Sequence, residues 1–137
     1  MKHAVLDSPV GRLVAVVDPS SLALPNARRA TLLRLAEALA DGEVDLSPGA
    51  DRARARAALL ALPGIGPWTA DTVTMRALGD PDAFLPTDLG VRAAATTLGI
   101  DNVVGRARRW APWRSYAVQH LWGTGDHAVN RLPEEAA

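Results

Sequence analysis

The stretch of the sequence best suited to chemistry is Leu62–Ala70, which reads Leu-Pro-Gly-Ile-Gly-Pro-Trp-Thr-Ala. Its two glycines can adopt positive φ and bring bare backbone amides close to a partner. At the start of a helix, unpaired N–H groups and the helix dipole attract an anion such as a phosphate. The amides that would do so here are those of Gly64, Gly66, Trp68 and Thr69. An ordinary tight turn between two helices has the same spacing, and the glycines alone favour that simpler interpretation.

The basic residues are unevenly distributed along the chain. Fifteen Lys and Arg balance fifteen Asp and Glu, so nucleic-acid binding does not follow from net charge. From Val103 to Trp122, however, there is no acidic residue and there are four arginines, at positions 106, 108, 109 and 114. A neutral chain can still present a basic face of the kind that phosphate binding needs. Arg109 and Arg114 flank the junction of the last two expected helices and could reach a phosphate, but solvated surface arginines are the default expectation.

Composition excludes several classes of protein. The length of 137 residues, 48% of them hydrophobic, suits one domain with a real core. The absence of cysteine rules out disulfides, thiolate metal sites and a cysteine nucleophile. No apolar run approaches the roughly 18 residues of a membrane span, and the N-terminus does not resemble a signal peptide. His120 and His127 lack the spacing of metal ligands. We therefore expect a cytoplasmic domain.

Hydrophobic patterning predicts a mainly α-helical fold, a helical bundle preceded by a short N-terminal β-hairpin. His3–Asp7 and Arg12–Asp18 are rich in Val and Leu and are separated by turn residues, as in a hairpin. From Asn26 onward the hydrophobic period is helical. About six helices are expected: 27–40 with Asn26 as N-cap, 51–62, 67–78, about 87–98, one capped by Asp101 or Asn102 that runs to 109–111, and one from Pro112 to 123–125.

Four segments, in order, resemble the helix-hairpin-helix DNA glycosylase superfamily. Leu62–Ala70 is similar to its signature, and three further segments narrow the resemblance to the DNA-3-methyladenine glycosylase II branch: residues 84–88 (FLPTD), 109–117 (RWAPWRSYA) and 120–122 (HLW). The resemblance covers about Leu22 to Thr124. It implies a helix-hairpin-helix motif and a bacterial, nucleoid-associated repair enzyme. Such an enzyme would act as a monomer on double-stranded DNA, hydrolysing the N-glycosidic bond of alkylated purines such as 3-methyladenine and 7-methylguanine.

Asp88 matches the family's catalytic aspartate. Without the resemblance, a helix N-cap is the simpler interpretation of Asp88. Thr87 could serve as the cap equally well, which would free Asp88 for another role. A carboxylate beside C1′ stabilises the oxocarbenium-like sugar and orients or deprotonates the attacking water. Dipoles at a helix N-terminus would help to keep that carboxylate ionised.

Trp68 and Trp122 correspond to aromatic residues that line the family's base pocket. An indole face attracts a cationic methylated purine more than a neutral base. Core packing is the alternative for Trp122, and it is the preferred interpretation for Trp110 and Trp113. Bifunctional members carry a Schiff-base lysine where this chain has Trp68. The only lysine is Lys2, so the resemblance implies base removal without strand cleavage.

The family's hairpin grips the DNA backbone with the help of a monovalent cation, Na⁺ or K⁺, on backbone carbonyls. By position these would be the carbonyls of Leu60, Leu62 and Ile65. No other cofactor is expected.

The sequence departs from the family at its N-terminus. Full members begin with a β-rich domain and helices that form one wall of the pocket and supply the wedge for base flipping. Nothing before Leu22 resembles them, and residues 4–13 instead resemble the opening hairpin of methylated-DNA–cysteine methyltransferases. We expect residues 1–21 to be a hairpin-like segment of different origin, 22–124 a partial glycosylase domain and 125–137 a polar tail. A non-catalytic module that binds DNA backbone therefore stays open as the alternative function.

Overall fold

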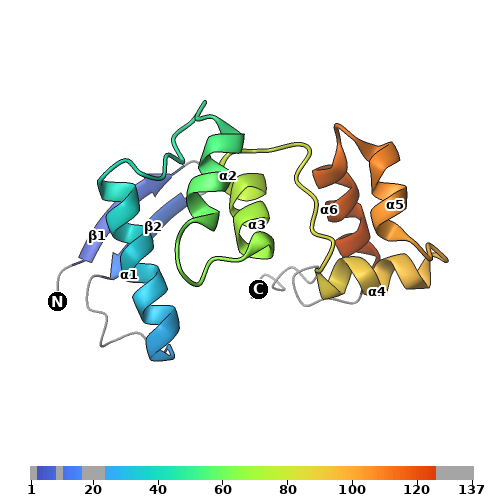
Figure 1. Ribbon diagram of the computed structural model, residues 1–137, viewed down its shortest axis with the longest axis horizontal. Helices are drawn as coiled ribbons and strands as arrows, with labels where there is room; N and C mark the ends of the chain where they lie inside the picture. Colours follow the sequence, from blue (N-terminus) through green and yellow to red (C-terminus); the bar gives the residue numbers. More distant parts are fainter. Residues whose placement is uncertain (1–2, 9–10, 17–23, 126–137) are drawn as a thin grey trace, which may run out of the picture.

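The computed structural model describes residues 3–8, 11–16 and 24–125, with side chains described for 24–125. The described chain is mainly helical, as its sequence predicts (Figure 1). Its elements are β1 (His3–Ser8), β2 (Gly11–Val16), α1 (Asn26–Ala40), α2 (Arg52–Leu60), α3 (Pro67–Ala77), α4 (Leu89–Thr97), α5 (Val103–Ala107), the 3-10 helix η2 (Arg108–Trp110) and α6 (Arg114–Thr124). Within the described ranges, none of the helices has the length and apolar character of a membrane span.

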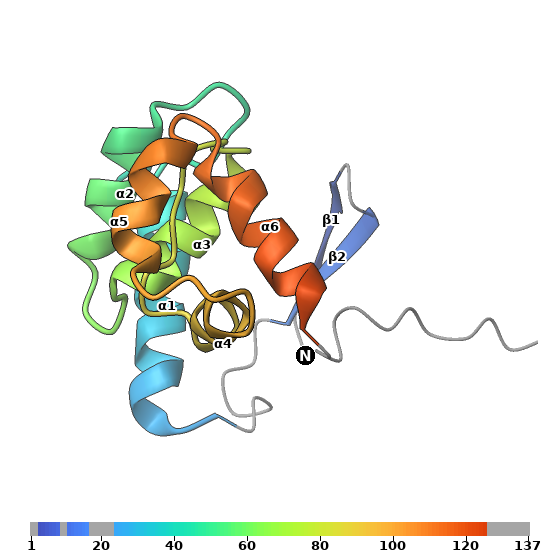
Figure 2. The ribbon, with the colours of Figure 1, turned by 90° about the vertical axis from the view of Figure 1, so that its right-hand side faces the viewer.

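The two strands form an antiparallel pair, visible as the blue arrows in Figure 2. Their register runs from His3 opposite Val16 to Ser8 opposite Gly11. The predicted turn residues Pro9 and Val10 lie outside the described residues. Lys2 and His127 also lie outside them.

Several helix ends differ from the sequence prediction, and three of them have a clear local cause or position. Pro25, not Asn26, is the N-cap of α1: its backbone is extended, and its carbonyl accepts the N–H of Arg29 at 3.1 Å. Helix α2 ends at Leu60 rather than residue 62, because the chain tightens there and Leu62 N–H donates to the carbonyl of Leu59. Helix α6 begins at residue 114 instead of 112.

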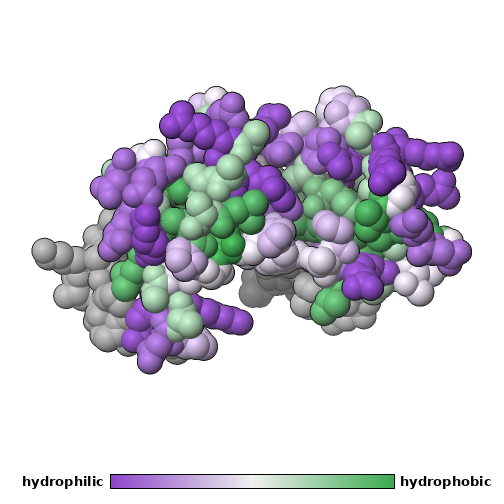
Figure 3. Space-filling model, in the orientation of Figure 1, coloured by the Kyte–Doolittle hydropathy of each residue, from purple (hydrophilic) through white to green (hydrophobic). Residues whose placement is uncertain are grey.

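The hydrophobic core consists of two clusters. The first lies among α1, α2 and the start of α3, and comprises Ala38, Val44, Leu59, Leu62, Ile65 and Ala70. The second joins the end of α3 to α4 and α6 and comprises Met75, Ala83, Leu85, Val91, Ala94, Val118 and Leu121. Figure 3 shows hydrophobic surface, in green, over both halves of the molecule, bordered by hydrophilic residues. Helix α3 contributes to both clusters and is therefore the element that connects the two halves.

The expectation of core packing holds for only one of the two tryptophans near the start of α6. Trp110 packs against the second cluster and meets Phe84 edge to face, with ring centroids 6.3 Å apart. Trp113 is 58% exposed, so its predicted burial is wrong. The buried face of α6 consists of Ser115, Val118 and Leu121, and Trp113 precedes that stripe as the N-cap.

Candidate active site

A hollow of about 690 Å³ opens between α3, the N-terminus of α4 and α6. Three of the predicted site residues, Trp68, Asp88 and Trp122, lie together in its wall although they are far apart in the sequence. Its complete lining is Trp68, Arg76, Thr87, Asp88, Leu89, Gly90 and Trp122. Among these residues Asp88 is the anion and Arg76 the cation, and the other side chains are neutral.

Asp88 is held at the start of α4 by the local chain. Leu85 is completely buried and its carbonyl accepts the N–H of Asp88 at 3.2 Å. Asp88 has extended backbone angles, and its Oδ1 accepts the N–H of Val91 at 2.8 Å, as an N-cap carboxylate does. The cap is therefore Asp88 and not Thr87, which corrects the sequence interpretation. The capping hydrogen bond occupies one lone pair of Oδ1. The other lone pair of Oδ1 and both lone pairs of Oδ2 can still accept hydrogen bonds from groups in the hollow.

Both tryptophans of the hollow donate to this carboxylate. The indole N–H of Trp122 donates to Oδ1 of Asp88 at 2.8 Å, and that of Trp68 donates to Oδ2 at 2.8 Å. Hydrogen bonds from an N–H donor to a carboxylate are charge-assisted and fix its orientation. The sequence predicted these tryptophans as pocket walls, but it gave no sign that they contact Asp88.

The hydrogen bonds to Asp88 favour its ionised form. Burial acts to raise the pKa of the carboxyl, but donation from Trp122, from the N–H of Val91, from Trp68 and from the N–H of Gly90 outweighs it. The pKa of Asp88 is therefore lowered from its ordinary 3.8. All four donors are neutral. Within the described part of the chain no cationic side chain forms an ion pair with Asp88, so its negative charge is not neutralised.

The two indoles differ in their surroundings. Trp68 is 45% exposed, so part of its ring is open to solvent. Trp122 is half-buried against the second core cluster. The guanidinium of Arg76 lies over the Trp122 ring, 5.6 Å from its centroid. A Cβ on Gly90 would lie 3.1 Å from Cδ1 of Trp122, so a glycine at this position lets α4 approach the ring closely.

The turn between α2 and α3 places backbone amides next to this site. Gly64 has φ of +85°, and a Cβ there would lie 2.1 Å from the hydroxyl oxygen of Thr31, so the position requires glycine. Ile65 is buried in the first cluster and anchors the turn. Gly66 is the N-cap of α3, and among the described side chains none caps that helix end. The first-turn amides of α3 are thus left without a side-chain acceptor.

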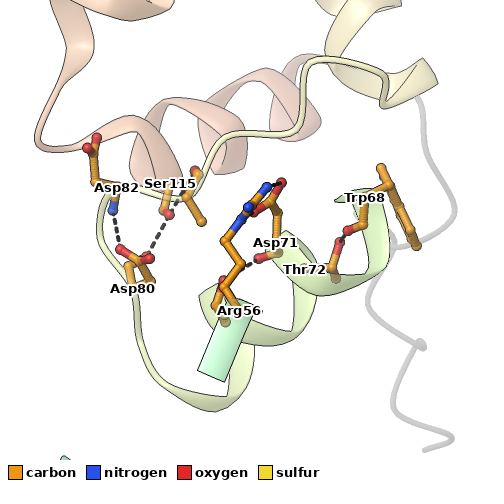
Figure 4. Close-up of polar contacts among 9 residues, drawn as sticks. Arg56, Trp68, Asp71, Thr72, Asp80, Asp82 and Ser115 are labelled. Carbon is orange, nitrogen blue, oxygen red and sulfur yellow. Dashed lines mark hydrogen bonds and ion pairs between the residues drawn. The ribbon is translucent and has the colours of Figure 1, made fainter. Parts of the chain in front are cut away.

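An ion pair fixes α3 to α2 (Figure 4). The Nε of Arg56 lies 2.5 Å from Oδ1 of Asp71, and its Nη2 donates to Oδ2 at 3.2 Å. Asp71 is buried, whereas Arg56 is partly exposed. One turn away, the hydroxyl of Thr72 donates to the carbonyl of Trp68 at 2.7 Å. The ion pair helps to orient the helix that carries Trp68, and no local pattern in the sequence predicts it.

The two arginines expected to contact phosphate are in different situations. Arg114 donates to both oxygens of Asp82, from Nε at 2.7 Å and from Nη2 at 2.6 Å. This fork holds the loop before α4 on the first turn of α6, and it lowers the pKa of Asp82. Arg109 is exposed and lines a shallow hollow beside Arg106. Arg109 is therefore the more accessible of the two.

Known proteins resemble the chain over most of its length. No protein-family model matches it. It is 51% identical over 126 residues to the "Probable bifunctional transcriptional activator/DNA repair enzyme AlkA" of Mycobacterium tuberculosis, covering 89% of this chain and 25% of that protein. It is 34% identical over 119 residues to "DNA-3-methyladenine glycosylase 2" of Escherichia coli, covering 85% and 42% respectively. It is also 37% identical over 71 residues to "DNA-3-methyladenine glycosylase" of Bacillus subtilis. The chain thus spans less than half the length of these relatives.

Proposed function

The chain belongs to the DNA-3-methyladenine glycosylase II branch of the helix-hairpin-helix DNA glycosylases, and from this premise we propose that it hydrolyses the N-glycosidic bond of alkylated purines in double-stranded DNA. The substrates are bases of the 3-methyladenine and 7-methylguanine type. One observation carries the proposal: Asp88 is held ionised in the wall of a hollow by neutral donors, two of which are indoles that line the same hollow.

The proposed chemistry uses the free negative charge of Asp88. An alkylated purine is cationic and leaves readily, and the sugar develops positive charge at C1′ as the bond breaks. A carboxylate that is already paired with a cation would offer little to that charge, whereas Asp88 is held by dipoles and keeps its full charge. It can also orient or deprotonate the attacking water. Because Trp68 takes the place of a Schiff-base lysine, the product is an abasic site and the strand stays uncut.

We further propose that α2, the turn at 61–66 and α3 form the helix-hairpin-helix motif that binds the DNA backbone. The amides of Gly64, Gly66, Trp68 and Thr69 would donate to phosphate, which is consistent with the uncapped start of α3. Arg109, which is exposed, would add an accessible positive charge to the DNA-binding surface, whereas Arg114, whose charge is paired with Asp82, would act by holding the loop before α4.

The carbonyls of Leu60, Leu62 and Ile65 would hold a Na⁺ or K⁺ ion in the same turn. That of Leu62 already accepts the N–H of Ile65 at 3.2 Å and retains a second lone pair for a cation. Held there, such an ion would supply positive charge that attracts a DNA phosphate.

Residues 22–124 are proposed to be the part of a glycosylase domain that carries the carboxylate and the backbone-binding turn. In this proposal residues 1–21 are a hairpin segment of different origin, 125–137 are a tail, and the chain acts as a monomer.

The test compares Asp88→Asn with Asp51→Asn in the release of methylated purines from alkylated duplex DNA. Both aspartates are helix N-caps, since Asp51 accepts the N–H of Arg54 at 2.9 Å, but only Asp88 lines the hollow. Asparagine caps a helix as well as aspartate does. Asp88→Asn should lower the rate of release by at least roughly a hundredfold, the usual effect of losing a preorganised charge. Asp51→Asn should retain the rate.

Two outcomes would contradict the proposal. Undiminished release by Asp88→Asn would remove the carboxylate from the reaction. If the unmodified chain binds duplex DNA but releases no base, its function is that of a backbone-binding module.

A further inference from the structure

We propose that Arg76 is a positioning residue for Asp88 and that it acts through Trp122: its guanidinium holds the indole in the orientation from which the N–H donates to the carboxylate. The relevance of this inference to the reaction rests on the proposed function, because that proposal assigns the chemistry to Asp88. The inference goes further by giving a role to a residue that is not among the hydrogen-bond donors of the carboxylate.

The Trp122 side chain is held from three directions. Its indole N–H donates to Oδ1 of Asp88 at 2.8 Å. Its ring packs against the second core cluster and is half-buried. The guanidinium of Arg76 lies over the ring, with Cζ 5.6 Å from the centroid, which is within the range of a cation–π contact. The ring is therefore restrained by the core, by the carboxylate and by a cation from α3.

Helix α3 reaches both oxygens of the carboxylate. Trp68 and Arg76 lie about two turns apart on this helix, and both line the hollow. Trp68 donates to Oδ2 of Asp88 directly, at 2.8 Å. Arg76 contacts Trp122 on α6, and Trp122 donates to Oδ1. One helix thus influences one oxygen directly and the other through a second indole.

The bond between Trp122 and Asp88 leaves little room for movement of the ring. A Cβ on Gly90 would lie 3.2 Å from Oδ1 of Asp88 and 3.4 Å from Nε1 of Trp122, the two atoms that the bond joins. The first turn of α4 therefore lies against the bond, and the ring cannot move toward it. A cation over the ring opposes displacements in other directions, because they break the cation–π contact.

Arg76 makes no ion pair that its removal would break. Its side chain is exposed, and in the part of the chain that the structure describes no carboxylate pairs with it. Arg56 and Arg114 differ in this respect, because each is paired with an aspartate. Substitution of Arg76 therefore tests the contact with the ring and leaves the ion pairs of the fold intact.

The first measurement is the hydrogen exchange of the two indole N–H groups in the full chain, followed by NMR. Both donate to Asp88, but the guanidinium lies over the ring of Trp122. Arg76→Met should raise the exchange rate of the Trp122 N–H by about two- to fivefold, the effect of losing an exposed cation–π contact. The exchange rate of the Trp68 N–H should stay the same. Arg76→Lys, which keeps a cation, should restore most of the protection.

The second measurement separates positioning from a direct effect of the charge on the carboxylate. The pKa of Asp88 is followed by NMR of its carboxyl carbon. Arg76→Met should raise this pKa when Trp122 is present, since a weakened donor stabilises the ionised form less. In a Trp122→Phe background, which has no indole N–H at this position, the same substitution should have no effect.

Arg106→Met is the matched control. Arg106 is an exposed arginine in the last turn of α5, as Arg76 is in the last turn of α3, but it does not line the hollow. Its substitution removes the same charge and should change neither the exchange rates nor the pKa of Asp88.

Three results would overturn the inference. They are an unchanged exchange rate at Trp122, an equal increase at both indoles, and an equal rise of the Asp88 pKa with and without the indole N–H. Neither measurement requires base release. Failure of the proposed function is therefore seen separately, as a chain in which Arg76 holds Trp122 on the carboxylate but no base is released.

Discussion

The indole N–H of Trp68 donates to Oδ2 of Asp88 at 2.8 Å, across 20 positions of sequence. This bond joins the first turn of α3 to the N-cap of α4. The N–H of Trp122 completes the arrangement from α6, at 2.8 Å from Oδ1. The orientation of the carboxylate thus depends on three helices and not on α4 alone.

Trp68→Phe separates the two roles of this tryptophan, because phenylalanine keeps an aromatic ring but has no N–H. One of the donors that lower the pKa of Asp88 is lost, so that pKa should rise. The acid limb of the pH profile of base release should therefore move to higher pH. Loss of the hydrogen bond should also lower the free energy of unfolding by about 1 kcal/mol. An acid limb that does not move would show that the indole N–H has no influence on the carboxylate.

The lowered pKa of Asp88 also predicts how stability depends on pH. A carboxyl whose pKa is lower in the folded than in the unfolded chain contributes stability above its unfolded pKa, near the ordinary 3.8. That contribution is lost as the pH falls through the lower, folded pKa. In urea titrations the unfolding free energy should fall less steeply with acid in Asp88→Asn than in the unmodified chain. Equal slopes would contradict the shift.

Substitution by alanine should cost much more stability at Gly64 than at Gly66. Gly64→Ala forces a side chain into positive φ and against Thr31, which should cost roughly 2 kcal/mol or more. Gly66→Ala meets nothing within 4 Å and should cost at most about 1 kcal/mol, the difference between glycine and alanine as an N-cap. Urea denaturation measures both. When Thr31 is also replaced by alanine, the loss of stability caused by Gly64→Ala should be smaller. A loss that stays the same would mean that it comes entirely from the positive φ and not from the clash with Thr31.

Arg109 and Arg114 should differ in what their loss affects. Arg109→Met should weaken duplex DNA binding and reduce the salt dependence by about one phosphate contact, with the fold unchanged. Arg114→Met should lower stability, because it frees Asp82 and loosens the loop before Asp88. Thermal unfolding and salt titrations of binding distinguish the two. A stable Arg114→Met variant with the binding defect of Arg109→Met would contradict this assignment.

Local chemistry made much of the fold predictable. Asp51 and Asn102 cap helices as their residue types suggest, and Pro67 occupies the first turn of α3. The start of α1 was misplaced by one residue because the carbonyl of Pro25 accepts the first helical bond, so capping needs no side chain from Asn26. Sequence signals of this kind act over four residues, and within that range they are strong.

Local signals of this kind could not predict the side-chain contacts in and around the site. From the sequence, Asp88 can be either a helix cap or a pocket carboxylate, because nothing local reveals that its two oxygens can serve both purposes. The pairing of Arg114 with Asp82 spans 32 positions, and that of Arg56 with Asp71 spans 15. Side chains so far apart meet only after the helices pack. Arg76 is an exception, because its position in the wall of the hollow could have been predicted: it lies two helical turns after Trp68, on the same side of α3.

The two core clusters share α3 but otherwise draw on different helices, so the two halves of the molecule can unfold separately. Each cluster can protect its own amides from hydrogen exchange, so α1 with α2 and α4 with α6 form candidate units of separate partial unfolding. The residues that meet at Asp88 come from α3, α4 and α6, and they meet only where the second unit docks on α3. Release of that unit would separate the carboxylate from Trp68 while the turn at 61–66, anchored by Ile65 in the first unit, stayed folded.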